Sequence, residues 1–207
     1  PHAVVTDVAS VKGYVLEELR AAGVDLGRYV GSHPMAGRER SGPSAAVPDL
    51  FLGRPWVITD SGSSDPDALL AVRSLAVDLG AVPVSMEAAE HDAAVAAVSH
   101  LPQLAASLVA ARLRALDEPA LGLAGQGLRD MTRIAASDPA LWTSILAANA
   151  LAVRSVLVAL RDDLDRVVDA LTSAALATGP EDVAPGALAA IADAIAAHRS
   201  TLVFVNS

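Results

Sequence analysis

The chain has 207 residues, enough for one large domain or two small ones, and 53% of them are hydrophobic, enough for a sizeable core. It has no cysteine, which excludes disulfides, zinc–thiolate sites and thiol nucleophiles. The net charge is −9 and no basic cluster occurs, so we expect no binding to nucleic acid. Every long apolar run is interrupted by charged or polar residues, so no membrane span is predicted, and the first residues do not resemble a signal peptide.

The first 86 residues show the pattern of an α/β sheet. Ser10 is a candidate N-cap for a first helix that Gly23 would close, and a second helix is predicted from Pro66 to Gly80. Pro83 indicates that the last strand starts there or lies at an edge. The predicted strands are residues 3–7, 29–30, 56–60 and 82–86. Their alternation with helices is typical of an α/β domain.

After Met86 the pattern becomes helical. Pro102 should kink or break the first of these helices near Leu101, and Asp138 with Pro139 should open a later one. The predicted helices are residues 87–116, 123–136, 138–175 and 180–197. The length of the third helix favours an intertwined dimer over a monomeric alanine-rich bundle. We therefore predict two domains, residues 1–86 and residues 87–207.

Residues 31–39, Gly-Ser-His-Pro-Met-Ala-Gly-Arg-Glu, are the most distinctive stretch. Glycines flank a histidine, and Pro34 biases His33 toward extended geometry. We expect a strand to end here in a rigid loop, where open α/β sheets build their sites. His33 is then a candidate general base, and Glu39 could bind a cationic group, raise the imidazole pKa or face solvent. A tight turn with a surface histidine is the alternative.

Residues 7–12, Asp-Val-Ala-Ser-Val-Lys, lie between a predicted strand and a predicted helix. A helix N-terminus offers free amide donors that suit a phosphate, a carboxylate or a polarised hydroxyl. Ser10 could cap this helix, orient an imidazole or do both. Lys12, the only lysine of the chain, lies in the same stretch, and we give it little weight.

Two histidines lie on the helix predicted for residues 87–116. His91 and His100 are nine residues apart, which is about 180° on an ideal helix, so they do not form a metal site by themselves. No metal is predicted. His100 and Gln103 are three apart and share a face. We assign His91 a structural role and favour a site role for His100, because the break at Pro102 frees backbone carbonyls.

Residues 125–135 combine a glycine-rich start with a dense polar cluster. Asp130 and Arg133, three apart, can pair on one helical face, or Arg133 can instead hold a carboxylate with two hydrogen bonds. A solvated helix start is the alternative. No Gly-x-Gly-x-x-Gly follows a strand anywhere in the chain.

Taken together and in this order, these motifs resemble the prephenate/arogenate dehydrogenases. The resemblance rests on residues 7–12, 31–42, 91–103 and 129–135, and it extends to about Trp142. It implies an α/β remnant, the C-terminal half of a Rossmann-like nucleotide-binding domain, over residues 1–86. An all-α helical dimerisation domain would follow over residues 87–207. The resemblance further implies a cytoplasmic homodimer that acts on a small molecule, without nucleic acid or membrane as partner.

The family's reaction oxidises a cyclohexadienol, prephenate or arogenate, with loss of carbon dioxide on the route to tyrosine. The resemblance implies that His33 takes the proton of the ring hydroxyl and that Ser10 orients His33. It implies that Arg133 binds a substrate carboxylate and that Asp130 holds that region. The remaining implied residues are His100 and Glu39, which would line the substrate pocket, Gln103, which stands where some members have a second histidine, and Asp7, Val8, Ser10 and Pro34, which would border NAD or NADP.

One departure limits these expectations. Family members begin with a strand and a glycine-rich phosphate loop, whereas this sequence starts after that point, so we expect the polypeptide alone neither to bind NAD nor to turn over. The alternative is a helical dimerisation module with a vestigial sheet and no activity. A glycine-rich strand–turn–helix just upstream in the gene would favour the enzyme, and a start codon immediately before Pro1 would favour the module. The choices between prephenate and arogenate and between NAD and NADP stay open.

Overall fold

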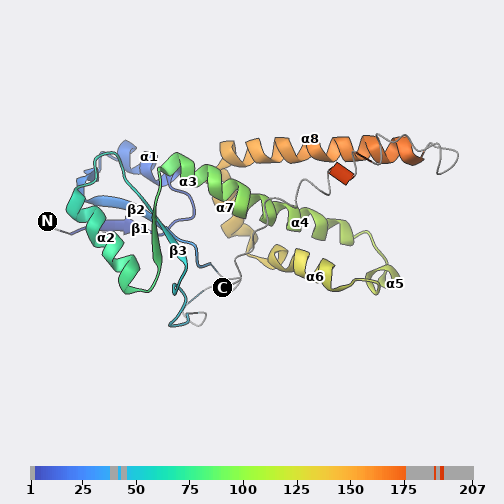
Figure 1. Cartoon of the computed structure of the whole chain (residues 1–207), viewed down its shortest axis with the longest axis horizontal. Coiled ribbons are helices and arrows are strands. Elements are labelled where there is room, and N and C mark those ends of the chain that lie inside the picture. Colours follow the sequence, from blue (N-terminus) through green and yellow to red (C-terminus); the bar gives the residue numbers. More distant parts are fainter. Residues whose placement is uncertain (1–2, 38–41, 43–45, 176–188, 190–191, 194–207) are drawn as a thin grey trace. The chain divides into compact units, whose positions relative to one another are not determined.

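The computed structural model describes residues 3–37, 42, 46–175, 189 and 192–193. They belong to two compact units, residues 1–153 and residues 154–207, which are treated separately here. In the first unit a four-stranded sheet with flanking helices is followed by a run of helices (Figure 1). This confirms the predicted fold class, an α/β part followed by a helical part. The boundary after Met86 stays a prediction.

The sheet is mixed. Its strands are β1 (Val5–Asp7), β2 (Tyr29–Pro34), β3 (Pro55–Thr59) and β4 (Val82–Ser85), in that spatial order. β1 and β2 are parallel, β2 and β3 antiparallel, and β3 and β4 parallel. The carboxyl ends of β1 and β2 therefore lie together at one edge of the sheet, opposite the ends of β3 and β4. β4 is the last strand in the order, as the proline at position 83 predicts.

Helix α2 (Pro66–Asp78) covers one face of the sheet (Figure 1). Its residues Ala68, Val72 and Ala76 recur every four positions and form one buried stripe. That stripe packs against Val30 of β2 and Trp56 and Ile58 of β3, and this cluster is the core of the α/β part. Asp65 and Pro66 begin the helix as the sequence predicts.

Helix α1 (Gly13–Ala21) begins later than predicted. Lys12, not Ser10, is its N-cap, so the assignment of Ser10 as a helix cap is wrong. Gly23, with φ 69°, ends the helix as expected, because this left-handed conformation costs glycine little. A 3-10 turn, η1 (Leu26–Arg28), then leads into β2.

The predicted loop at His33 is also corrected, because β2 continues through Pro34 and His33 pairs with Val57 of β3. The antiparallel partner, which the sequence pattern did not reveal, keeps this stretch extended. Position 31 of this strand needs glycine, because a Cβ atom there would collide with the Thr59 hydroxyl. The side chain of His33 thus projects from the end of a strand.

Helix α3 (Ala88–Val95) and helix α4 (Leu101–Leu113) are joined by one π-helical turn, η3 (Ala96–His100). The break falls beside Pro102, as predicted, because proline donates no amide to the preceding turn. A π turn is wider than an α turn, so ideal-helix spacing does not apply across it. His91 and His100 are both buried, each with 1% exposure.

The chain then returns along α4. The returning elements are α5 (Glu118–Leu121), α6 (Gln126–Thr132), the 3-10 turn η4 (Arg133–Ala136) and α7 (Pro139–Ala148), and helix α8 (Ala150–Ala175) follows. Helix α6 lies beside α4 (Figure 1). The single helix predicted for residues 138–175 is wrong, because it breaks at Asn149, whose buried amide bonds to other elements. The helix predicted at residues 180–197 lies outside the described residues.

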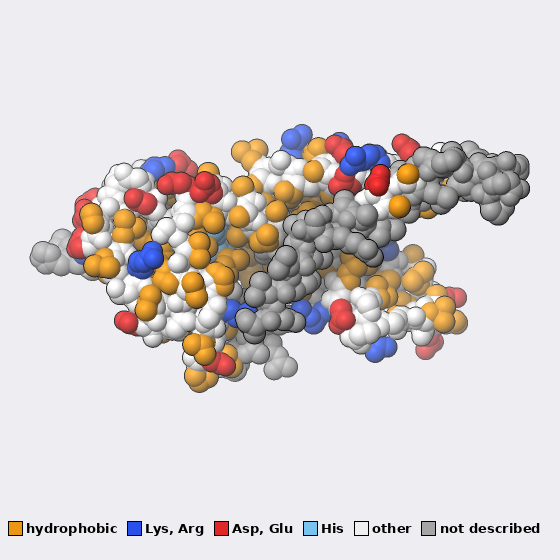
Figure 2. All heavy atoms as spheres, in the orientation of Figure 1, with side chains coloured by type: hydrophobic (Ala, Val, Ile, Leu, Met, Phe, Trp, Pro, Cys, Tyr) orange, Lys and Arg blue, Asp and Glu red, His pale blue; other side chains and the backbone are white. Residues whose placement is uncertain are grey.

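Helix α8 supplies most of the described residues of the second unit. Leu164, Val168 and Leu171 are exposed, and their spacing places them on one helical face. Charged side chains of both signs lie along this helix (Figure 2), and Arg161 pairs with Asp162 at 2.7 Å. An amphipathic helix of this kind has an apolar face available for packing.

The helical run Ala88–Leu113 has a mean hydropathy of 1.5 and is long enough to cross a membrane by length and composition. Core helices share these properties, and this run places His91, His100 and Gln103 in buried positions. The α7–α8 pair would meet the same criterion only as one broken span. The absence of a membrane span stays a prediction.

Candidate active site

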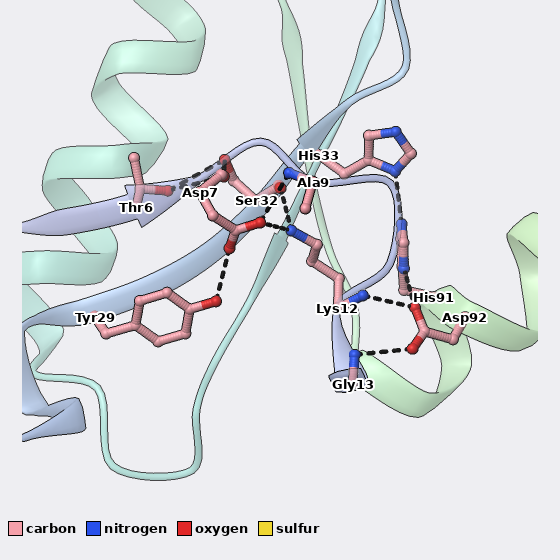
Figure 3. A network of polar contacts seen from close by, with 10 residues as sticks. All are labelled: Thr6, Asp7, Ala9, Lys12, Gly13, Tyr29, Ser32, His33, His91 and Asp92. Carbon is pink, nitrogen blue, oxygen red and sulfur yellow. Dashed lines mark hydrogen bonds and ion pairs between the residues drawn. The ribbon is translucent and has the colours of Figure 1, made fainter. Parts of the chain in front are cut away.

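His33 at the end of β2 starts a chain of polar contacts that ends on α3 (Figure 3). Its Nδ1 atom lies 2.8 Å from Nε2 of His91, and the two rings meet edge to face with centroids 5.1 Å apart. Nδ1 of His91 lies 2.8 Å from Oδ1 of Asp92. Asp92, His91 and His33 are thus connected one after the other, and this row of three side chains is called the relay below. The Nε2 atom of His33 takes no part in these contacts.

Asp92 also caps α1 from outside that helix. Its two carboxylate oxygens accept the backbone amides of Lys12 and Gly13, each at 2.8 Å. Gly13 permits this approach, because a Cβ atom there would lie 2.9 Å from Oδ2 of Asp92. Burial raises the pKa of Asp92, but the bonds from His91 and the two amides outweigh it, and the pKa lies below its usual value. Asp92 is therefore ionised at neutral pH.

A second polar cluster lies beneath His33, around the only lysine of the chain (Figure 3). The ammonium group of Lys12, with 1% exposure, bonds to the carboxylate of Asp7 and donates to the carbonyl of Ser32 at 2.6 Å. Tyr29 donates its hydroxyl to the other oxygen of Asp7 at 2.6 Å. Burial lowers the pKa of Lys12, and its bond to Asp7 opposes this shift. The cluster ties the ends of β1 and β2 to the start of α1.

These neighbours keep His33 neutral. Burial, followed by the nearby His91 and Lys12, lowers the pKa of His33 to about 4. At neutral pH the side chain is therefore an uncharged imidazole with one nitrogen lone pair. Such a group can accept a proton from a hydroxyl.

The helical part supplies His100 and Gln103, both buried. His100 packs edge to face on Trp142, with centroids 6.0 Å apart, and lies 3.3 Å from the amide nitrogen of Asn149. That same amide donates to the backbone carbonyl of Asp92 at 2.8 Å, so it links His100 to helix α3. Gln103 donates to the carbonyl of Ile134 at 3.0 Å.

The other predicted residues are more dispersed. Arg133 is exposed at the start of η4, and Asp130 accepts a hydrogen bond from Gln126 at 2.8 Å. Ser10 is half-buried, and in the described part of the chain its hydroxyl makes no hydrogen bond to His33. Val8 is exposed at the end of β1, Pro34 ends β2, and Glu39 lies outside the described residues. No group of three metal-ligating side chains comes together among the described residues.

The sequence did not predict a role at this site for four residues, Lys12, His91, Asp92 and Asn149. A structural role was assigned to His91, and only its position before an acid hinted at the bond to a carboxylate. The available signal for Lys12 was that the only lysine of the chain lies between a predicted strand and a predicted helix. The break at Asn149 had none, because a long apolar helical pattern continues on both sides of it.

The fold and these contacts are those of an α/β protein with a neutral histidine at the carboxyl edge of its sheet and a run of helices after the sheet. Comparison with known families gives the same two parts in the same order. Residues 1–85 match the family model described as prephenate dehydrogenase, nucleotide-binding domain, and residues 87–177 match the model described as prephenate dehydrogenase, dimerization domain. The chain belongs to the prephenate dehydrogenase family.

Individual relatives give the extent of the likeness. The "Probable prephenate dehydrogenase NovF" of Streptomyces niveus is 42% identical over 170 residues, which are 82% of this chain and 47% of that protein. The structure of prephenate dehydrogenase from Aquifex aeolicus with hydroxyphenyl propionate and NAD+ is 31% identical, with a TM-score of 0.74, over 82% of this chain and 60% of that one. Arogenate dehydrogenase of Synechocystis is 32% identical, with a TM-score of 0.70, over 82% and 62%. The chain thus spans about half the length of NovF.

Proposed function

We propose that the protein containing this chain oxidises prephenate with loss of carbon dioxide and hydride transfer to NAD(P), giving 4-hydroxyphenylpyruvate. Arogenate, which would give tyrosine, is the alternative substrate. The observation that carries the proposal is the neutral His33, held by His91 at the carboxyl edge of the sheet. Family membership supports the same reaction.

The chemistry assigned to this chain is the handling of one proton. The hydroxyl on the substrate ring donates its proton to Nε2 of His33 as the carbon–oxygen bond becomes a carbonyl. A bound nicotinamide would supply the acceptor for the hydride that leaves the same carbon. The ring carboxylate then departs as carbon dioxide, and its bonding electrons complete the aromatic ring. His33 can return the proton to the resulting phenolate oxygen, so the step balances.

The residues at the sheet edge suit the nicotinamide end of a dinucleotide. Val8 is exposed at the end of β1, and we expect it to border the ring together with Ser10 and Pro34. Asp7 is already bonded to Lys12 and Tyr29, so its contribution would be indirect. The first amides of α1 do not fit a pyrophosphate, because the carboxylate of Asp92 occupies them. NAD and NADP are distinguished only by the assay below.

We assign the substrate carboxylates to the helical part. Arg133 would hold a carboxylate with its planar guanidinium, and Asp130 would support the same region. His100 and Gln103 would border the pocket, with Gln103 acting on the Arg133 segment through the Ile134 carbonyl.

We expect the protein to act as a homodimer built through its helical domain. The match of residues 87–177 to a dimerization domain supports this, as does the exposed apolar face of α8 formed by Leu164, Val168 and Leu171. A dimerisation module without activity would use the same face. The two possibilities are separated by activity, since only an enzyme reduces NAD(P).

The test is an absorbance assay of cofactor reduction with the complete gene product, read from its own start codon. Prephenate and arogenate are compared, each with NAD and NADP. The variant His33→Asn should lower kcat by about 10²–10⁴-fold, the usual contribution of a positioned base. Asp67→Asn, which removes an exposed carboxylate on α2, should leave kcat unchanged. Near-normal kcat in His33→Asn would remove His33 from the mechanism, and no reduction under any condition would favour the module.

A further inference from the structure

We infer that His91, held by Asp92, is a positioning residue that fixes the tautomer of His33, so that the Nε2 lone pair of His33 faces the substrate. Its catalytic meaning rests on the proposed function, whereas the tautomer itself does not. The relay joins an element of the α/β part to an element of the helical part, β2 to α3 (Figure 3).

The first step is the proton on His91. An ionised carboxylate only accepts hydrogen bonds, and Oδ1 of Asp92 lies 2.8 Å from Nδ1 of His91. The same carboxylate receives the amides of Lys12 and Gly13, which keep it oriented. A lone pair on Nδ1 of His91 would face this negative oxygen without a hydrogen between them. The proton of His91 therefore resides on Nδ1.

The second step passes this choice to His33. A neutral imidazole carries one N–H, so with its proton on Nδ1, His91 presents a lone pair at Nε2. That lone pair lies 2.8 Å from Nδ1 of His33, a hydrogen-bond distance that requires a proton on one side. His33 then carries its proton on Nδ1. Its Nε2 is left as the acceptor, which is the form that a general base needs.

The relay also serves the protonated state. In water a neutral imidazole favours the proton on Nε2, so an unsupported His33 would populate the form that cannot accept a proton there. Once Nε2 has taken the substrate proton, the Nδ1–H of the imidazolium still donates to His91, and His91 still donates to the carboxylate. An acid that orients a histidine in a catalytic triad has the same two effects.

Kinetics of two matched variants test the role. His91→Leu removes the acceptor, whereas His91→Gln offers an amide oxygen to the same N–H. In the complete gene product we expect His91→Leu to lower kcat by about 10²-fold while KM for prephenate changes by less than about 3-fold, because only the proton transfer is affected. His91→Gln should recover most of kcat. Equal kcat for wild type and His91→Leu, or no recovery in His91→Gln when both fold with equal Tm, would overturn the inference.

A second readout needs neither substrate nor turnover. Nitrogen-15 NMR of histidine-labelled complete gene product reports which ring nitrogen carries the proton, with His33→Asn and His91→Leu used for assignment. We expect His33 to be protonated on Nδ1 in the wild type and on Nε2 in His91→Leu. Wild-type His33 with its proton on Nε2, or a doubly protonated His91, would overturn the inference. An inactive protein with the expected tautomer would instead contradict only the proposed function.

Discussion

Lys12 shows how much one buried side chain can organise. Its ammonium group joins the Asp7 carboxylate at the end of β1 to the Ser32 carbonyl in β2, and its own backbone amide is capped by Asp92. A buried charge is tolerated only when it is paired and hydrogen-bonded, and each of these conditions is met here. The residue thus holds the strand that carries His33.

Removing that ammonium group should cost considerable stability. Lys12→Met keeps most of the side-chain volume but leaves the carboxylate of Asp7 without its buried counter-ion. We expect a loss of about 3 kcal/mol in the free energy of unfolding, the usual effect of breaking one side of a buried pair. Urea unfolding followed by circular dichroism measures it.

A matched variant shows that burial is the cause. Arg161 pairs with Asp162 on the exposed surface of α8, so Arg161→Met should leave the free energy of unfolding nearly unchanged. Equal effects of Lys12→Met and Arg161→Met would contradict the importance of the buried cluster.

For single residues, the sequence indicated candidate roles, but it did not indicate which side chains contact each other. The glycines and the proline around His33 made it a candidate base, with a surface histidine in a tight turn as the alternative. Its partner His91 is 58 positions away, and the amide of Lys12 meets Asp92 across 80 positions. Such pairings depend on the packing of α3 against the start of α1, which no local pattern encodes.

Between elements, Gln103 links helix α4 to the turn η4, which carries Arg133. Gln103 donates to the carbonyl of Ile134, the residue after Arg133, and the hydroxyl of Ser137 donates to the same oxygen at 2.7 Å. The amide of Gln103 thereby sets how the turn that carries Arg133 lies on α4.

Replacing this amide should affect substrate binding more than chemistry. In Gln103→Leu we expect KM for prephenate to rise by about 10-fold with kcat within about 2-fold, since Arg133 loses a support and His33 does not. Stability should fall by about 1 kcal/mol, the net contribution of one hydrogen bond. Steady-state kinetics and thermal unfolding measure the two effects.

The control removes a polar group that supports no other element. Thr143→Val deletes an exposed hydroxyl on α7 that bonds only within its own helix, so KM and Tm should stay unchanged. A larger fall in kcat than rise in KM for Gln103→Leu would mean that Gln103 acts on the reacting atoms instead.

The elements themselves were largely predictable where apolar spacing alone decides them. The order of strands and helices up to β4 and the break beside Pro102 follow from such spacing and from proline. The errors occur where a distant side chain decides. Helix α1 starts at Gly13 because Asp92 caps it, β2 extends through His33 because β3 pairs with it, and the helix from Pro139 ends where Asn149 turns inward.

For the molecule as a whole, the question is what the described sheet can hold by itself. β1 is the first strand in the spatial order, and Val5 on it and Val8 just after it are exposed, with 58% and 61% exposure. A dinucleotide needs a glycine-rich turn whose helix N-terminus receives the pyrophosphate, and the sequence contains no Gly-x-Gly-x-x-Gly after a strand. The amides that begin α1 are bonded to Asp92.

We therefore expect the 207-residue chain to show no measurable binding of NAD, which means a Kd above about 1 mM, because no site for the pyrophosphate is found among the described residues. Isothermal titration calorimetry with NAD and with NADP measures this directly, and the complete gene product titrated in the same buffer serves as the reference.

An Asp92→Asn variant of the chain tests whether the capped helix limits binding. Weaker capping frees the α1 amides without supplying a glycine-rich turn, so the affinity for NAD should stay low. Micromolar binding by the 207-residue chain would show that its four strands already form a complete dinucleotide site, and the pyrophosphate would then have to be held by residues other than the first amides of α1.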